Sequence, residues 1–286
     1  MKHYFLTPLL LCSTVSLANE QTSDSSWYDF LQQKRDGGGF FSAGIVVQNS
    51  QGLYRSEDFK VRPELKGAYY FKNGLFIEFP GRSDKFENQI AVGYNLGSTD
   101  SWEFDVLLSI AHGGLTYTGA QSSFKKDASS YWGLRAMGTI AGLDTMLVYG
   151  INGNQSDYRN GQYGAAWLGK SWNIHNWHLY SSLGAQYRNE AMLDFYYGVP
   201  DNHASLPAYD AKGGVNFIYK VGFKKPLTEN WLVEGNFSMT RYADSIIDSP
   251  YSQSILQGDE KRSENGRTLS LSISYVFYMK LIYCVF

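Results

Sequence analysis

The chain has 286 residues with 25 Lys and Arg against 27 Asp and Glu, and this balance excludes a protein that binds nucleic acid by neutralising phosphates. Aromatic residues make up 16% of the chain and 29 Gly stand against 7 Pro, which excludes a disordered or collagen-like chain. Only 18% of residues are charged, so Ser, Asn, Gln, Tyr and Gly supply most of the polarity. This composition favours β-structure with one polar and one apolar face.

The N-terminus has the pattern of an export signal. Lys2 and His3 precede an apolar run at 5–11, and Ser16 and Ala18 offer small residues at a cleavage site. We therefore expect a cleaved signal peptide at 1–18 and a periplasmic segment at 19–38. One cysteine, Cys284, would then remain, so neither an internal disulfide nor a cysteine metal site is expected. Past residue 18, no apolar run reaches the roughly 18 residues of a membrane helix, so a membrane crossing would use strands.

Period-two alternation of apolar and polar residues predicts about twelve strands. The predicted strands, in chain order, are 40–48, 60–71, 75–79, 86–96, 102–112, 131–143, 145–152, 163–172, 177–188, 215–224, 231–240 and 268–277. The clearest is the last, in which Leu269, Leu271 and Ile273 alternate with serines.

The predicted connections alternate in length along the chain. Short turns are expected at 72–74, 97–100, 142–144, 173–176 and 227–230, and long links at 49–58, 113–130, 153–160, 189–212 and 243–267. This alternation is typical of an up-and-down antiparallel β-barrel in the outer membrane, with periplasmic turns and extracellular loops. A soluble lipocalin-like barrel or β-sandwich is the alternative, and it would bury the apolar face inside.

Charged residues fall on the strand face opposite the apolar one, as expected for a transmembrane barrel with its apolar face in lipid. The predicted inward charges are Lys60, Arg62, Glu64, Lys66, Glu78, Asp105, Arg135, Arg188, Lys220, Lys224 and Glu234. Two interpretations stay open. Seven cations against four anions would give an open pore a preference for anions. We prefer an interior filled by paired side chains, because a barrel of this size has limited room.

A motif in the longest predicted links carries a family resemblance. It comprises Phe195, Tyr196, Tyr197, Gly198, Val199 and Pro200, then Ala204, then Leu206, Pro207, Ala208, Tyr209 and Asp210, then Gly213 and Gly214. Together with Arg62-Pro63, 69–74, the 227–231 turn and 248–250, it resembles the signature of the MipA/OmpV family, whose name is short for MltA-interacting protein. The resemblance covers most of the chain after the signal peptide.

The resemblance implies an outer-membrane β-barrel of a Gram-negative bacterium. It also implies a scaffold that links a lytic transglycosylase and a bifunctional penicillin-binding protein to the outer membrane. The segment 195–214 is too apolar for a solvated loop, so we expect it to pack into the barrel mouth or to carry a partner surface. Packing is the more frequent reason for such residues.

The C-terminal strand carries the expected assembly signal. Leu271, Ile273, Tyr275 and Phe277 form the outward pattern that the barrel assembly machinery reads, yet nine residues follow Phe277. The tail at 278–286 is atypical for the family, and a longer last strand, a shifted reading frame and a tail folded back at the periplasmic rim all stay open.

A hydrolase is the third class of function considered, beside a scaffold and a small-solute channel. Ser109 and His112 differ in parity, so they would face opposite sides of a strand unless a bulge intervened. His175, His178 and His203 are isolated, and the acidic residues of the last long link lack the spacing of a calcium loop. The sequence therefore predicts neither a catalytic residue nor a cofactor or metal site.

Overall fold

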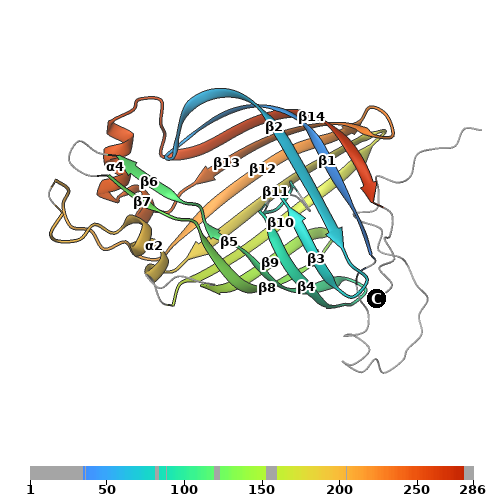
Figure 1. Ribbon diagram of the computed structural model, residues 1–286, viewed down its shortest axis with the longest axis horizontal. Coiled ribbons are helices and arrows are strands. Elements are labelled where there is room, and N and C mark those ends of the chain that lie inside the picture. Colours follow the sequence, from blue (N-terminus) through green and yellow to red (C-terminus); the bar gives the residue numbers. More distant parts are fainter. Residues whose placement is uncertain are drawn as a thin grey trace, which may run out of the picture.

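The computed structural model describes residue 35 and residues 37–80, 84–87, 89–118, 123–152, 160–203 and 205–279. Twelve strands form a closed barrel in the order β1-β14-β13-β12-β11-β10-β9-β8-β5-β4-β3-β2, and every neighbouring pair is antiparallel (Figure 1). The predicted all-β, twelve-stranded up-and-down barrel is therefore confirmed.

Most barrel strands have eight or more residues, and they begin within five residues of the predicted positions. Their bounds are β1 Gly38–Gly52, β2 Arg55–Tyr70, β3 Leu75–Phe79, β4 Ala91–Ser98, β5 Trp102–His112, β8 Ser129–Ile140, β9 Leu143–Asn152, β10 Gln162–Ile174, β11 Trp177–Arg188, β12 Gly214–Pro226, β13 Trp231–Arg241 and β14 Asn265–Met279. A separate hairpin consists of β6 Leu115–Thr118 and β7 Ser123–Lys126. The helices are α2 Glu190–Tyr197, α3 Asp244–Ile247 and α4 Pro250–Gln257.

The apolar face of the sheet points outward. On β14, Leu271 is 53% exposed, whereas its neighbours Ser272 and Ser274 are buried inside. The same holds for Leu183 on β11, which is 64% exposed next to buried Ser182. A soluble barrel would show the reverse, so this surface is built to contact lipid.

The two ends of the barrel differ in their connections. At one end, the turn rim, short turns at 71–74, 99–101, 141–142, 175–176 and 227–230 join the strands. At the other end, the loop rim, the hairpin β6-β7 and helices α2, α3 and α4 lie together over the barrel (Figure 1). We call these elements, with residues 53–54, the cap. Alternation of short and long links is thus largely confirmed.

Two predicted boundaries were wrong. The expected long link at 49–58 is a tight turn, because β1 continues to Gly52 and β2 starts at Arg55, which leaves only Leu53 and Tyr54 between them. Leu53 is fully buried in the cap core, which holds the turn in place. The fourth strand starts at Ala91 instead of Phe86, because residues 84–87 fold into the barrel.

β2 is bonded unequally on its two edges. It pairs with β1 from Tyr70 up to Arg55, but with β3 only from Gly67 to Tyr70. β3 has just five residues, so the wall of the described barrel is lower at this place.

Several expectations concern residues outside the described part of the chain. They are the signal peptide at 1–18, most of the periplasmic segment 19–38, and residues 280–286 of the atypical tail. The first two tail residues, Tyr278 and Met279, continue β14 and pair with β1. None of the described helices is long and apolar enough to cross a membrane.

Candidate functional site

A buried ion-pair network crosses the lumen between β3, β5 and β8. Arg135 on β8 contacts Glu78 Oε2 on β3 at 2.7 Å through Nη1 and Asp105 Oδ2 on β5 at 2.9 Å through Nη2. All three side chains are buried, and Tyr70 donates its hydroxyl to Glu78 at 3.0 Å. Each charge is thus matched by hydrogen bonds, as a buried charge requires.

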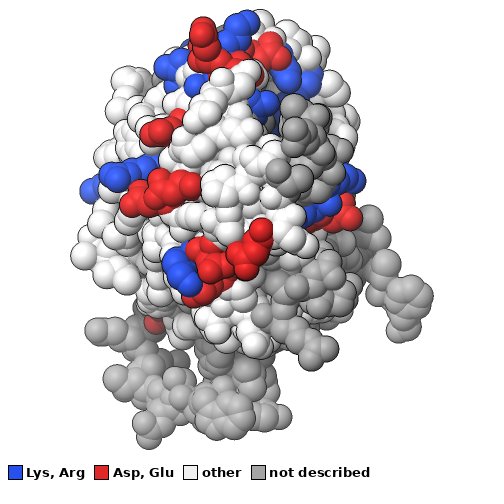
Figure 2. Space-filling view, turned by 90° about the vertical axis from the view of Figure 1, so that its left-hand side faces the viewer, with Lys and Arg blue, Asp and Glu red and all other residues white. Residues whose placement is uncertain are grey.

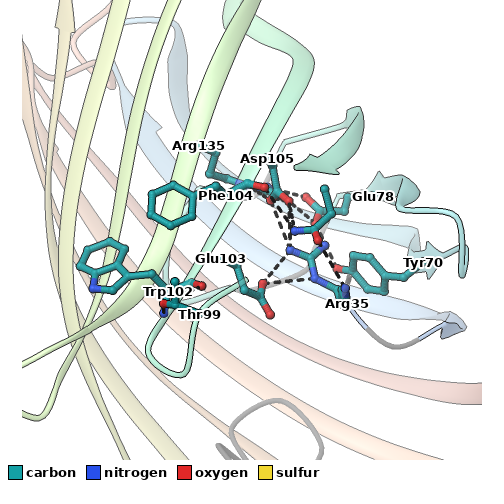
Figure 3. Close-up of polar contacts among 10 residues, drawn as sticks. Arg35, Tyr70, Glu78, Thr99, Trp102, Glu103, Phe104, Asp105 and Arg135 are labelled. Carbon is teal, nitrogen blue, oxygen red and sulfur yellow. Dashed lines mark hydrogen bonds and ion pairs between the residues drawn. The ribbon is translucent and has the colours of Figure 1, made fainter. Parts of the chain in front are cut away.

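Arg35, which precedes the first strand, joins this network (Figure 3). Its Nη2 lies 2.6 Å from Glu103 Oε2 and 3.2 Å from Asp105 Oδ1. The guanidinium also lies over the ring of Tyr70, 4.6 Å from the ring centroid. Because Asp105 accepts from both Arg35 and Arg135, the residue in front of β1 is anchored inside the barrel wall.

A second charge cluster fixes residues 84–87, which we call the inward loop. Asp84 lies 2.7 Å from Lys224 Nζ and 3.6 Å from Lys66 Nζ, and Glu234 lies 2.9 Å from each lysine. Burial alone would raise the pKa of the Asp84 carboxyl, but the charges of Lys224 and Lys66 outweigh it and hold that pKa well below its usual range. Asp84 is therefore an ionised clamp between β2 and β12.

The inward loop also binds the opposite wall through its backbone. Lys220 donates to the carbonyl oxygens of Asp84 and Phe86, and Ser182 donates to the carbonyl oxygen of Lys85. Gln186 donates to Glu87 at 2.9 Å. The inward loop thus reaches from its own side of the barrel to β11 and β12 and occupies part of the lumen.

The structure brings most of the predicted inward charges together, but not all of them. Lys66, Lys220, Lys224 and Glu234 hold the inward loop, and Glu64 lies 3.4 Å from Lys66. Arg188 is buried and donates to the carbonyl oxygen of Ala111. Arg62 donates to Gln48, and Lys60 is 68% exposed in a rim pair with Asp58.

The family-signature residues form the core of the cap. Tyr196 and Tyr197 are fully buried at the end of α2, and the hydroxyl of Tyr196 donates to the carbonyl oxygen of Asp127. Tyr197 meets Tyr54 and His112 through its hydroxyl. Tyr209 donates to the carbonyl oxygen of Ser245. These contacts pack the segment into the barrel mouth, which was the preferred expectation for it.

The glycines of the signature allow close approach. A Cβ on Gly198 would meet the side chain and backbone of Asp194, and one on Gly214 would lie 2.5 Å from the Cβ of Ala243. Gly213 is less tight, 3.2 Å from the backbone nitrogen of Glu190. Leu206 packs against the small core around Tyr251 and Val199, whereas Pro207 is exposed.

On the cap surface, charges of both signs are mixed. Figure 2 shows the loop rim, where Lys and Arg lie next to Asp and Glu around a largely uncharged centre. No single-sign field covers this face in the described part. Over the described residues of this face, the mixed charges form no single-sign funnel of the kind that steers charged solutes.

Ser109 and His112 meet different partners. A register shift between Ile110 and His112 turns the histidine inward, as a bulge would. Ser109 donates to the carbonyl oxygen of Ile90, while His112 stacks on Tyr196 at 3.8 Å between ring centroids. Among the described residues, no group of His, Cys, Asp and Glu is arranged to hold a metal ion.

The sequence patterns missed the charged residues that lie outside the strands and pair with strand residues inside the lumen. Arg35 and Asp84 lie outside every predicted strand, and Glu87, although it falls in the predicted strand 86–96, is not among the predicted inward charges. A signal for α2 was present, since Asn189 can cap a helix whose buried positions 192, 193, 196 and 197 recur at helical spacing.

A closed twelve-stranded sheet with an apolar outer face and a charged interior defines an outer-membrane β-barrel. The sequence matches the family described as MltA-interacting protein MipA over residues 42–277, and the chain belongs to this family. The resemblance found in the signature loop is thereby confirmed. No curated protein matches the chain.

Among solved structures, the chain is similar to outer-membrane barrels. OmpT of Vibrio cholerae has 8% identity and a TM-score of 0.45, with 85% of this chain and 99% of that chain covered. An anion-selective porin from Comamonas acidovorans has 9% identity and a TM-score of 0.41, with 85% and 99% covered. OprB of Pseudomonas putida has 8% identity and a TM-score of 0.40, with 85% and 94% covered.

Proposed function

We propose that this protein is a non-catalytic outer-membrane anchor that holds peptidoglycan-remodelling enzymes at its turn rim. The observation that carries the proposal is the inward loop, which Lys66, Lys224 and Lys220 tie across the lumen. A barrel filled in this way acts through its rims more readily than through its interior. The family description, an MltA-interacting protein, supports a lytic transglycosylase as one partner. A penicillin-binding protein is proposed as the other.

The turn rim offers small, well-ordered turns. Thr228 Oγ1 accepts from the backbone N–H groups of Asn230 and Trp231, and Asn230 Nδ2 donates to the carbonyl oxygen of Val276. Such turns lose little entropy when a partner binds. A few of them bury less than the roughly 1,200 Å² of a stable interface, so binding is weak unless the segment 19–38 adds surface.

The contacts of Arg35 support a contribution of the segment 19–38 to partner binding. Because its side chain is fixed by Glu103 and Asp105 within the lumen, the segment 19–38 ends at a fixed point of the barrel. A partner that holds both this segment and the turn rim gains the affinity that the turns alone lack.

The test is crosslinking in intact cells from a photoreactive residue at a single position. Glu229 and Asp100 are exposed on the turn rim, and Asp201 is exposed on the cap as a matched control. We expect a lytic transglycosylase or a penicillin-binding protein to be captured from positions 229 and 100 and not from 201. Capture from the cap alone, or of no peptidoglycan enzyme from the turn rim, would overturn the proposal.

The same anchor must first enter the membrane. Leu271, Ile273, Tyr275 and Phe277 all lie on β14, where Leu271, Ile273 and Phe277 are exposed to the outside. This supports recognition by the barrel assembly machinery as the second kind of partner. Replacing Phe277 with Ser should lower the amount of heat-modifiable barrel in the outer membrane, while Phe59→Ser on β2 should not.

A channel for small solutes is the second candidate, favoured by a lumen cavity of about 190 Å³ lined in part by Arg62, Lys66 and Lys220. An open state would prefer anions, and neutralising Lys220 and Lys224 should weaken that preference most at low salt. Planar-bilayer recordings decide it, because a barrel without conductance steps is not a channel.

A further inference from the structure

One edge of β2 is left largely unpaired by the described strands. Above Gly67, no described strand pairs with the edge of β2 that faces away from β1. Only near the tip does this edge find a partner, where the N–H of Glu57 donates to the carbonyl oxygen of Lys261 at 2.9 Å. Between these two points, no described strand covers residues 58–66 above the short strand β3, and we call the gap beside this edge the lateral opening.

Pro63 lies in the middle of this open edge. The N–H of Phe71 donates to Leu75 in β3 and that of Glu57 to Lys261, so N–H groups of odd-numbered residues of β2 point away from β1. Pro63 has the same parity and lacks an N–H. A proline is tolerated in a sheet where no neighbouring strand needs its N–H, and the Arg62-Pro63 pair therefore marks the opening.

The opening lies at the depth of the lipid. Tyr69 and Phe71 belong to the aromatic residues of the turn rim, and a tilted strand of about ten residues crosses the apolar band of a membrane. Counting up β2 from Tyr69 reaches Phe59, and Phe59 and Val61 point outward with more than 60% of their surface exposed. The opening therefore faces the outer leaflet, below the loop rim.

The lumen cavity of about 190 Å³ borders the inward residues of this part of β2. Its lining includes Arg62, Glu64, Lys66, Asn236, Ser270 and Ser272. Pockets that enclose a whole drug-sized ligand measure roughly 300–1,000 Å³, so this one suits a polar headgroup.

Arg62 stands at the border of the opening and the cavity. Its Nη2 donates to Gln48 Oε1 at 2.7 Å, and its side chain is exposed although it faces inward. Among the described residues, Arg62 pairs with no carboxylate, whereas Lys66 is held by Glu234 and Asp84. A guanidinium in this position matches the oxygens of a phosphate.

We propose that the lateral opening admits the phosphate-bearing head of an outer-leaflet amphiphile into the lumen cavity. Arg62 binds the phosphate, the hydroxyls of Ser270 and Ser272 donate to the head, and the acyl chains stay in the membrane against Phe59 and Val61. This site is independent of the turn rim and of the proposed anchor function.

A strand from a partner protein fits the open edge less well. Pro63 removes a donor from the middle of the ladder, and charged residues such as the exposed Lys60 and Arg62 are features that protect strand edges from pairing. The amphiphile needs no continuous ladder, so the observations favour it.

The test is headgroup photolabelling of the full-length protein in phosphatidylglycerol nanodiscs. A trace of phosphatidylglycerol with a photoreactive group on its head is added, and the labelled peptides are mapped by mass spectrometry. We expect label on the lumen side of β13 and β14, at Asn236, Ser270 and Ser272. Arg62→Ala should lower this label about tenfold, the effect of losing one charge-assisted contact.

Two controls keep the outcome clear. Arg267→Ala removes an arginine from the rim, where it pairs with exposed Glu57, and it should leave the lumen label unchanged. Arg62→Gln keeps much of the side-chain length and serves if Arg62→Ala does not give a heat-modifiable barrel. Inorganic phosphate is added in a parallel sample and should not compete.

Three results would overturn the proposal. Label confined to outward residues such as Leu269 and Leu271, equal in both arginine variants, would show only lipid around the barrel. Competition by inorganic phosphate would show a site for a soluble anion. A crosslink from a photoreactive residue at Val61 to another protein in cells would show that a strand occupies the edge.

Discussion

Replacing Asp84 with Asn tests whether the inward loop is held by charge. The carboxylate lies 2.7 Å from Lys224 Nζ and 3.6 Å from Lys66 Nζ, and 12% of its side chain is exposed. At an effective dielectric constant of about 20, these distances give gross attractions of about 6 and 5 kcal/mol, largely offset by desolvation.

The net loss follows from what remains after the substitution. Removing one partner of a buried pair typically costs about 3–5 kcal/mol. Glu234 still contacts both lysines at 2.9 Å, so neither becomes an unpaired buried charge. We therefore expect Asp84→Asn to lower the free energy of unfolding by about 3 kcal/mol, at the low end of this range.

Urea unfolding in lipid vesicles, followed by the heat-modifiable band, measures this loss. Asp58→Asn is the control, because Asp58 and its partner Lys60 are both more than half exposed, and it should change stability by less than about 0.5 kcal/mol. A double-mutant cycle with Lys224→Gln should give a coupling energy of about 2 kcal/mol. A loss for Asp84→Asn no larger than that of the control would refute the charge clamp.

Three further predictions concern the cap and the other charge network. Gly198→Ala should destabilise the cap by about 1–3 kcal/mol, because the added Cβ would lie 2.5 Å from a backbone oxygen of α2. This loss should appear as faster proteolysis of the cap. Gly113→Ala is the control and should be neutral, because Gly113 has open space around it. Burial raises the pKa of Tyr197, so the neutral hydroxyl contributes fully to cap stability below about pH 10, and this contribution is lost as the pH rises through the raised pKa. Tyr197→Phe should therefore flatten the alkaline rise in cap proteolysis. Arg135→Met should cost about 4 kcal/mol in urea unfolding, and exposed Arg267→Met less than about 0.5 kcal/mol.

Period-two patterns predicted the barrel because each wall strand meets lipid on one face. On β14, alternation of Leu269, Leu271 and Ile273 with serines survives unchanged in the structure. The pattern failed at 86–96, where Phe86 and Ala91 look like parts of one strand. Phe86 is instead buried against Trp167 on the far wall, and a local pattern carries no information about such a contact.

The candidate sites were predicted in part for the same reason. Parity along β2 and β12 placed Lys66 and Lys224 inside, yet their partner Asp84 comes from a loop with no periodicity. The cap helices were missed because 189–212 and 243–267 were interpreted only as long links between strands of period two. Asn189, which caps α2, shows that the helix was encoded nonetheless.

Closure of the barrel depends on the seam between its first and last strands. β1 pairs with β14 from Gly39 and Met279 to Gln51 and Arg267, so these contacts join residues some 240 positions apart at one end of the seam. Contacts between such distant parts of a chain form late, because the entropy of closing the intervening segment is lost before any bond is gained. Until then both end strands expose unpaired edges, and a chain shortened before β14 would keep β1 permanently open to pairing with other chains.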